Sequence, residues 1–244
     1  MNLDLSTISN LKILDLGSYN GFDSIWDPLG YKAELIGIDP LIESGERMNN
    51  GRKEINLQKI VNNIKGNFKF NISRNKQASS LLEINEPLVS RFPQSWDGEI
   101  LEKINLEAET LDVLLEENNI NDLDFIKIDI EGSELNVLSK IENLLKNNVL
   151  GVQIETFFQE YHKGRPLFSD VYQYLNSFGF YLFDFRDMER WGKKTITQKY
   201  GYGQVMFANS LFLKDPILDN NINDLNKIKK LIVFSVLFEQ QDLA

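Results

Sequence analysis

Four carboxylates stand at or near the ends of apolar segments: Asp15, Asp39, Asp129 and Glu155. Ligands of open α/β sheets bind outside the carboxyl ends of the strands. Ionised carboxylates at that edge can accept hydrogen bonds from hydroxyl groups, take a proton or hold a hard metal ion. The pattern therefore predicts a ligand site along one edge of a sheet.

A turn with two glycines follows the first of these carboxylates, in Ile13-Leu-Asp-Leu-Gly-Ser-Tyr-Asn-Gly21. Glycine can take positive φ and has no Cβ, so such a turn lets backbone N–H groups approach a ligand closely. Between a first strand and a helix, the turn is typical of a nucleotide-type binding loop. The alternative is a tight turn that binds nothing.

Asp39 follows Gly21 by 18 residues. In dinucleotide-binding folds, an acidic residue at a spacing of about 20 binds the ribose hydroxyls. The alternative is an aspartate that begins a turn at the end of a strand. Together with the glycine turn, the spacing favours the ribose role.

The candidates for a catalytic base are Asp129, Glu131 and His162. Asp129 and Glu131 share a face if one strand runs through both. His162, the only histidine, lies in a predicted loop and has the pKa best suited to neutral pH; a lone loop histidine is more often simply solvated. Glu131 and Glu134 also lie at a predicted helix N-terminus, where the dipole favours negative charge, and for Glu134 we prefer that role.

A divalent metal held by Asp129, Glu131 and Glu155 is a further option, because hard oxygen ligands suit Mg²⁺. Nothing in the spacing of these residues requires a metal, so the sequence assigns no metal ligand.

Apolar segments indicate the strands that must position these residues. We expect strands at 11–16, 34–39, 54–61, 68–72, 123–129, 149–156, 180–185 and 204–213. Helical patterns between them predict a mainly parallel sheet with helices on both faces. We expect a loop with a short helix over 41–54 and an irregular acceptor wall over 85–104. The loop after 185, with Trp191, is expected to shape a pocket or form a lid.

Composition excludes several classes of protein. The 244 residues carry a net charge of −10 without a long basic run, so nucleic acid is not an expected partner. The absence of cysteine excludes disulfides and thiolate metal sites and fits a reducing cytoplasm. The sequence shows neither a signal peptide nor an apolar run of about 20 residues, so we expect a soluble protein without a membrane span.

The chain resembles methyltransferases of the FkbM family, within the class I S-adenosylmethionine-dependent enzymes, from about residue 11 to 216. Besides the glycine turn, the matching segments are Ile36-Gly-Ile-Asp-Pro40, Ala78-Ser-Ser-Leu-Leu82, Thr110-Leu-Asp112, Asp124-Phe-Ile-Lys-Ile-Asp-Ile-Glu-Gly-Ser-Glu134, Pro166-Leu-Phe-Ser-Asp170, Gly179-Phe-Tyr-Leu-Phe-Asp184 and Asn209-Ser-Leu-Phe-Leu213. The segment from 124 to 134 is the most specific. A Ser-Tyr pair stands in the glycine turn where Ala-Asn is more usual in the family.

The resemblance implies a Rossmann-like, seven-stranded sheet whose last strand is antiparallel and lies between the fifth and sixth. It implies that S-adenosyl-L-methionine binds with its methionine part at the glycine turn, its ribose at Asp39, its adenine near Asn62 and Asn63, and its methyl group towards Asp129. The expected cofactor-binding residues are Asp15, Gly17, Ser18, Tyr19, Gly21, Asp39, Pro40, Asn62, Asn63 and Asp129.

The expected function is O-methylation of a hydroxyl on a sugar, glycan or other small molecule. The alternative is an inactive S-adenosylmethionine-binding module of a larger protein or assembly. A nicotinamide-dependent oxidoreductase ranks low, because the G-x-G-x-x-G fingerprint is absent. We expect a methyltransferase domain over 1–216 and a helical extension over 217–244. The apolar face of that extension must be covered by the domain, by the second subunit of a homodimer or by further sequence.

Overall fold

The computed structural model describes residues 5–193, 203–218, 222 and 224–243. Its strands are β1 (Leu11–Leu16), β2 (Ala33–Ile38), β3 (Gly45–Asn49), β4 (Arg52–Leu57), β5 (Ile60–Asn62), β6 (Gly66–Ser73), β7 (Ile100–Thr110), β8 (Phe125–Ile128), β9 (Gly151–Phe157), β10 (Phe180–Trp191) and β11 (Gln204–Lys214). Its α-helices are α1 (Glu86–Val89), α2 (Leu111–Glu117), α3 (Glu134–Leu138), α4 (Glu142–Asn147), α5 (Phe168–Ser177) and α6 (Leu225–Leu237). Short 3₁₀ helices are η1 (Ser24–Lys32), η2 (Lys76–Ala78) and η3 (Pro93–Trp96).

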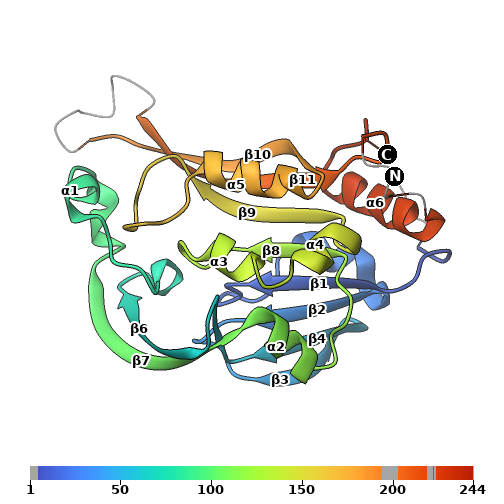
Figure 1. Ribbon diagram of the computed structural model, residues 1–244, viewed down its shortest axis with the longest axis horizontal. Coiled ribbons are helices and arrows are strands. Elements are labelled where there is room, and N and C mark those ends of the chain that lie inside the picture. Colours follow the sequence, from blue (N-terminus) through green and yellow to red (C-terminus); the bar gives the residue numbers. More distant parts are fainter. Residues whose placement is uncertain (1–4, 194–202, 219–221, 223, 244) are drawn as a thin grey trace.

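A mixed sheet of eight strands forms the centre of the fold, in the order β10-β11-β9-β8-β1-β2-β4-β3 (Figure 1). The run from β9 to β4 is parallel. β11 lies between β9 and β10 and is antiparallel to both. The expectation of seven strands is wrong, because β3 pairs with β4 and adds an antiparallel strand at the edge.

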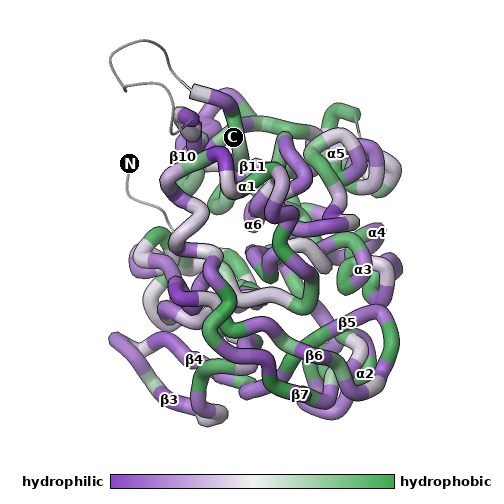
Figure 2. Tube along the Cα trace, turned by 90° about the vertical axis from the view of Figure 1, so that its left-hand side faces the viewer, coloured by the Kyte–Doolittle hydropathy of each residue, from purple (hydrophilic) through white to green (hydrophobic). Residues whose placement is uncertain are grey.

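The extra strand β3 forms a hairpin with β4. The turn residues Asn50 and Gly51 have φ of 51° and 80°. Asn-Gly readily takes positive φ at both central positions, which a two-residue hairpin turn of type I′ requires. The expectation of a loop with a short helix over 41–54 is therefore wrong. Figure 2 shows β3 as mostly hydrophilic, as suits an exposed edge strand.

A second sheet, β5-β7-β6, lies on the side towards which β1, β2 and β8 point (Figure 1). The single strand expected over 54–61 is divided, because β4 ends at Leu57 in the large sheet and β5 begins at Ile60 in the small one. The irregular structure expected over 85–104 is also partly wrong. It contains α1 and η3, and from Ile100 it is strand β7, which pairs with β6.

Both faces of the large sheet are covered by helices, as the strand pattern predicted. Successive side chains of a strand point to opposite faces. On one face, Leu14 and Ile126 pack with the apolar sides of α2, α3 and α5. On the other, Ile13 and Phe125 pack with η1 and α6. The strands are therefore held rigidly where their carboxyl ends carry polar residues.

Helix α6 covers the second face through aromatic side chains. The ring of Phe234 lies 5.0 Å from that of Phe125 and 6.5 Å from that of Trp26. Beside them, Lys230 Nζ donates to both carboxylate oxygens of Asp124, at 2.7 and 2.8 Å. The apolar face of α6 is thus covered by the sheet itself.

Among the described residues, none of the helices has the length and apolar content needed to cross a membrane.

Replacing Phe234 with alanine should lower the free energy of unfolding by about 3–5 kcal/mol, because a fully buried ring leaves a cavity in the core. Urea denaturation followed by circular dichroism measures the change. Leu225→Ala is the matched control in the same helix, since Leu225 is 63% exposed and should change stability by less than about 0.5 kcal/mol. Equal losses in the two variants would contradict the packing of α6 described above.

Candidate active site

A cavity of about 680 Å³ lies at the carboxyl ends of β1, β2, β8 and β9. Its volume is that of a pocket for a cofactor or another small molecule. The wall includes seven of the residues expected from the sequence: Gly17, Tyr19, Gly21, Asp39, Pro40, Asp129 and Glu131. Five other expected residues are not part of the wall: Asp15, Ser18, Asn62, Asn63 and His162.

The glycine turn touches the end of β8 without room for a side chain. Gly17 has φ of +88°, and a Cβ on it would lie 1.8 Å from the carbonyl oxygen of Asp129. Gly17 N donates to Ile38 O at 3.0 Å, and Asp129 N donates to Leu16 O at 2.9 Å. The turn is therefore locked between the ends of β2 and β8, and it presents its backbone to the cavity.

Asp39 follows β2 and lies on the cavity wall. Its Oδ1 accepts a hydrogen bond from Leu41 N at 2.7 Å, which fixes the carboxylate at the start of the next turn. Burial raises the pKa of Asp39, and the Leu41 N–H opposes that rise. The turn role and the ribose role considered for this residue are thus compatible.

Asp15 is fully buried and is not part of the cavity wall, so its expected place around the methionine part of the cofactor stays a prediction. It pairs with Lys127 across β1 and β8, and Lys127 Nζ donates to Asp15 Oδ1 at 3.1 Å. Burial raises the pKa of Asp15, and the Lys127 ammonium opposes the rise. Lys127 does lie on the wall. Asp15 therefore contacts the wall residue Lys127 from within the core.

Two further expected residues, Ser18 and Asn62, are buried and are not part of the cavity wall. Ser18 is buried beside Gly37, where a Cβ on Gly37 would lie 2.6 Å from Ser18 Oγ. Asn62 is buried in β5, and its Oδ1 accepts from Asn63 N at 2.8 Å. The wall near β5 is instead formed by 59–61, because β5 belongs to the small sheet and enters the cavity at its start.

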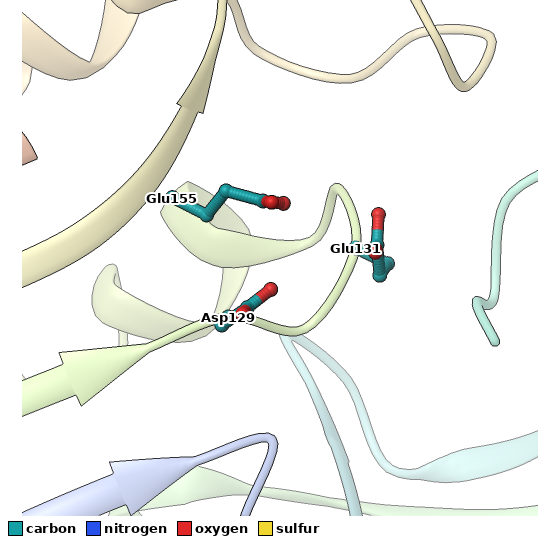
Figure 3. A group of neighbouring side chains, drawn as sticks. All are labelled: Asp129, Glu131 and Glu155. Atoms are coloured by element: carbon teal, nitrogen blue, oxygen red, sulfur yellow. The ribbon is translucent and has the colours of Figure 1, made fainter. Parts of the chain in front are cut away.

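Three carboxylates, those of Asp129, Glu131 and Glu155, meet at the cavity wall (Figure 3). One oxygen from each lies within 4.8 Å of the others. Asp129 directly follows β8, and Glu155 lies on the neighbouring strand β9. The strand does not continue to Glu131, which has φ of 59°. The sequence argument for a shared strand face is therefore wrong, and a left-handed turn brings Glu131 to the wall instead.

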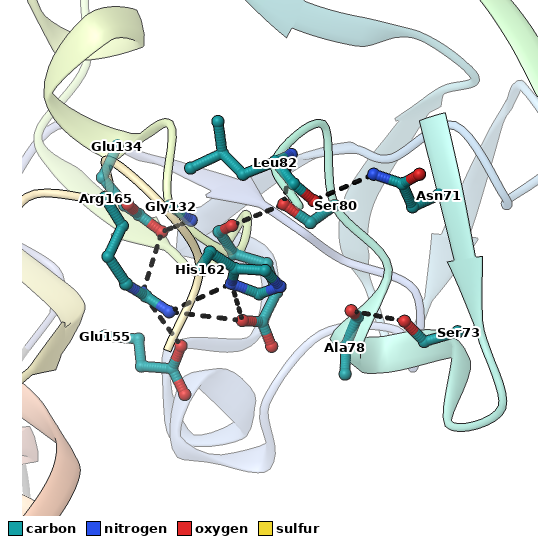
Figure 4. A network of polar contacts seen from close by, with 11 residues as sticks. Asn71, Ser73, Ala78, Ser80, Leu82, Gly132, Glu134, Glu155, His162 and Arg165 are labelled. Atoms are coloured by element: carbon teal, nitrogen blue, oxygen red, sulfur yellow. Dashed lines mark hydrogen bonds and ion pairs between the residues drawn. The ribbon is translucent and has the colours of Figure 1, made fainter. Parts of the chain in front are cut away.

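Ser80 holds that turn from the far side (Figure 4). Its Oγ donates to the carbonyl oxygen of Glu131 at 2.7 Å and accepts from Leu82 N at 2.9 Å. Asn71 of β6 donates to Leu82 O at 2.9 Å, which ties this segment to the small sheet. The family-like segment 78–82 thus positions the loop that carries Glu131.

Arg165, which the sequence analysis did not single out, is buried and lies beside Glu134 and Glu155 (Figure 4). Its guanidinium nitrogens lie 3.6 Å from Glu131 Oε2, 3.8 Å from Glu155 Oε2 and 3.9 Å from Glu134 Oε1. The guanidinium also stacks on Phe157, 3.4 Å from the ring centre. No sequence signal marked this arginine, because only the fold brings its loop to the ends of β8 and β9.

Burial dominates the electrostatics of this cluster. It raises the pKa of Glu131 to about 8 and that of Glu155 well above its ordinary value, and the negative charge of Asp129 adds to both rises. Glu134, expected to serve only the helix dipole, is also buried, and its Oε1 accepts from Gly132 N at 2.8 Å. Three glutamates, Glu131, Glu134 and Glu155, thus lie around one guanidinium, that of Arg165.

His162 is buried, and the expectation of a solvated histidine with a neutral-range pKa is wrong. Burial, with the nearby Arg165 charge, lowers the pKa of His162 to about 3. Its Nδ1 lies 3.4 Å from Arg165 Nη1 and 3.6 Å from Glu131 Oε2. A neutral imidazole outside the cavity wall can support Arg165, but it is a poor base for a substrate.

One part of the cavity wall is aromatic. Trp191, at the end of β10, packs edge-on against Tyr161 at 5.7 Å and Phe207 at 6.3 Å, and all three lie on the wall. From the expected acceptor segment 85–104, only Gln94 and Asp97 reach it. Trp96 is exposed beside Arg74 and is not part of the wall.

A comparison with models of known protein families shows to which family this chain belongs. The model of the methyltransferase FkbM domain matches residues 15–182, more than half of the sequence. The chain belongs to the FkbM methyltransferase family. Searches of curated proteins and of solved structures found no significant match. The FkbM match includes the glycine turn, the three carboxylates and Arg165, whereas Trp191 and Phe207 of the aromatic wall lie beyond it.

Replacing Gly17 with alanine should destabilise the protein more than replacing Gly21. Both glycines have positive φ, which costs a non-glycine residue about 1–2 kcal/mol. Only at Gly17 does a Cβ also collide with backbone, which should add about 1–3 kcal/mol. Chemical denaturation of both variants measures the difference. Equal destabilisation would mean that the close contact between Gly17 and Asp129 is absent.

His162 should remain neutral from pH 8 down to pH 5, because its pKa is about 3. As it is the only histidine, its imidazole resonance can be followed by NMR without assignment of others. We expect a flat chemical shift across that range. A midpoint near 6.5 would place the imidazole in solvent and contradict its burial. Since the pKa is depressed in the folded state, the stabilisation from His162 is present above pH 6.5 and is lost as the pH falls towards 3.

Proposed function

We propose that this FkbM-family protein is an S-adenosylmethionine-dependent methyltransferase that methylates a hydroxyl group of a sugar, glycan or other small molecule. The observation that carries the proposal is the position of the cavity. It lies where the glycine turn, Asp39 and Asp129 meet at the carboxyl ends of parallel strands. Ligands bind at that edge in α/β folds of this kind.

The residues of the wall fit the parts of this cofactor. The turn at Gly17 and Gly21 offers backbone groups without side chains to the methionine part. Asp39 offers carboxylate oxygens to the ribose hydroxyls. Ile60 and Val61 offer an apolar surface to the adenine ring, in place of the asparagines expected from the sequence.

Bound S-adenosylmethionine would supply a methyl group on a sulfonium, so transfer breaks a carbon–sulfur bond and forms a carbon–oxygen bond. The chain's contribution is to hold the acceptor oxygen in line and to remove its proton. Asp129 and Glu131 line the cavity, which supports a role for one of them in accepting that proton. The aromatic wall around Trp191 offers flat surfaces on which a sugar ring can stack.

Two substitutions should separate cofactor binding from methyl transfer. Asp39→Ala should weaken S-adenosylmethionine binding by about 10- to 100-fold, through the loss of charge-assisted hydrogen bonds. Asp129→Ala should lower turnover at least as strongly, by about 100-fold or more, if it takes the proton. Isothermal titration calorimetry measures binding. Transfer from methyl-labelled cofactor to a panel of sugars, glycans and lipids measures turnover.

Asp242→Ala is the control for both measurements, because Asp242 is exposed and far from the cavity wall in sequence and structure. Wild-type protein that binds no S-adenosylmethionine would overturn the proposal. Binding without any methylated product would favour the inactive binding module. Full turnover by Asp129→Ala would remove Asp129 from the catalytic assignment.

A further inference from the structure

The carboxylates of Glu131 and Glu155 are buried on the cavity wall with hydrogen-bonding capacity unused. Each side chain is only about a tenth exposed, at 11% and 10%. Among the described residues, Glu131 Oε2 and Glu155 Oε2 have no hydrogen-bond partner. Unsatisfied, buried carboxylate oxygens are costly, so their presence together on one cavity wall calls for a ligand.

Arg165 forms ion pairs with both of these oxygens but does not hydrogen-bond to them. Its nitrogens remain 3.6 and 3.8 Å from these two oxygens, beyond hydrogen-bond distance, and it is held in place by stacking on Phe157. Glu134 shares the same guanidinium. A single guanidinium therefore faces several carboxylates, and Lys127, a lysine on the same cavity wall, is already bonded to Asp15.

Asp129 completes a set of three oxygen ligands. One oxygen from each of Asp129, Glu131 and Glu155 lies within 4.8 Å of the other two (Figure 3). Two opposite ligands of one ion lie about 4.2 Å apart around Mg²⁺ and about 4.6–5.2 Å apart around Ca²⁺. The observed spacing accommodates a hard dication directly or after glutamate side chains move by a few tenths of an ångström.

We propose that Asp129, Glu131 and Glu155 bind a divalent cation with hard oxygen chemistry, such as Mg²⁺ or Mn²⁺. Three carboxylates leave the remaining coordination positions to water or to oxygens of the acceptor. The role of the cation in methyl transfer rests on the proposed function. There, the cation would bind the acceptor hydroxyl and favour its ionised form. The proton then leaves to a carboxylate or to water. Acceptors that offer two neighbouring oxygens would bind best, because they can chelate the ion.

Direct binding of Mn²⁺ tests the site without any methyl transfer. In electron paramagnetic resonance, the signal of free Mn²⁺ decreases as the ion binds to the protein. The size of that decrease gives the stoichiometry and the affinity of binding. We expect one Mn²⁺ per wild-type chain in the absence of S-adenosylmethionine. Glu155→Gln, which keeps the shape and removes the charge, should weaken binding at least tenfold. Asp129→Asn should do the same.

Glu116→Gln is the matched control, because Glu116 is exposed on α2 and lies outside the cavity wall. It should bind Mn²⁺ as the wild type does, and circular dichroism confirms that each variant is folded. No binding at millimolar Mn²⁺, or unchanged binding by both cluster variants, would overturn the inference. Titration with S-adenosylmethionine alone separates the two proposals. Binding of S-adenosylmethionine without binding of Mn²⁺ would overturn the metal site and leave the proposed function. Binding of Mn²⁺ without binding of S-adenosylmethionine would overturn the proposed function and leave the metal site.

Discussion

The backbone of Gly17 packs directly against the carbonyl of Asp129, and the geometry of the cavity depends on that contact. It brings the turn after β1 and the end of β8 together at a distance that no side chain would allow. Hydrogen bonds from Gly17 to Ile38 and from Asp129 to Leu16 tie the same point to β2 and β1. The glycine turn and the carboxyl ends of β2 and β8 are therefore joined at one point of the cavity wall.

Buried charge is the second constraint. The large sheet carries a group of largely buried carboxylates with Arg165 beside them, and Lys127 on the cavity wall is paired with the buried Asp15. Such an arrangement costs free energy in the empty protein, and the rest of the fold must supply that stability. The aromatic packing of Trp26, Phe125 and Phe234 on the opposite end of the strands is a source of it. The candidate site and this aromatic packing thus lie at opposite ends of the strands.

The small sheet forms part of the cavity wall. β5 and β6 add a wall beyond the ends of the large sheet, and Ser80, held next to β6, fixes the turn at Glu131. Residues 85–104 were expected to form that wall as an irregular segment, but their last part is a strand that belongs to the small sheet. Ile104, Leu106 and Ala108 alternate with polar residues, which is the pattern of a half-exposed strand, and the sequence analysis did not use it.

The sequence by itself determined the parallel strands, the glycine turn, the placement of Asp39 and Asp129 at strand ends and the FkbM family. These features depend on local patterns and on spacing along the chain, so they can be read without a structure. Only the tertiary structure decided that Asp15 lies beneath the cavity, that His162 is buried and weakly basic, and that Arg165 faces Glu131 and Glu155. Burial, and the contacts between segments distant in sequence, arise when the strands pack side by side, and residue types alone do not encode them.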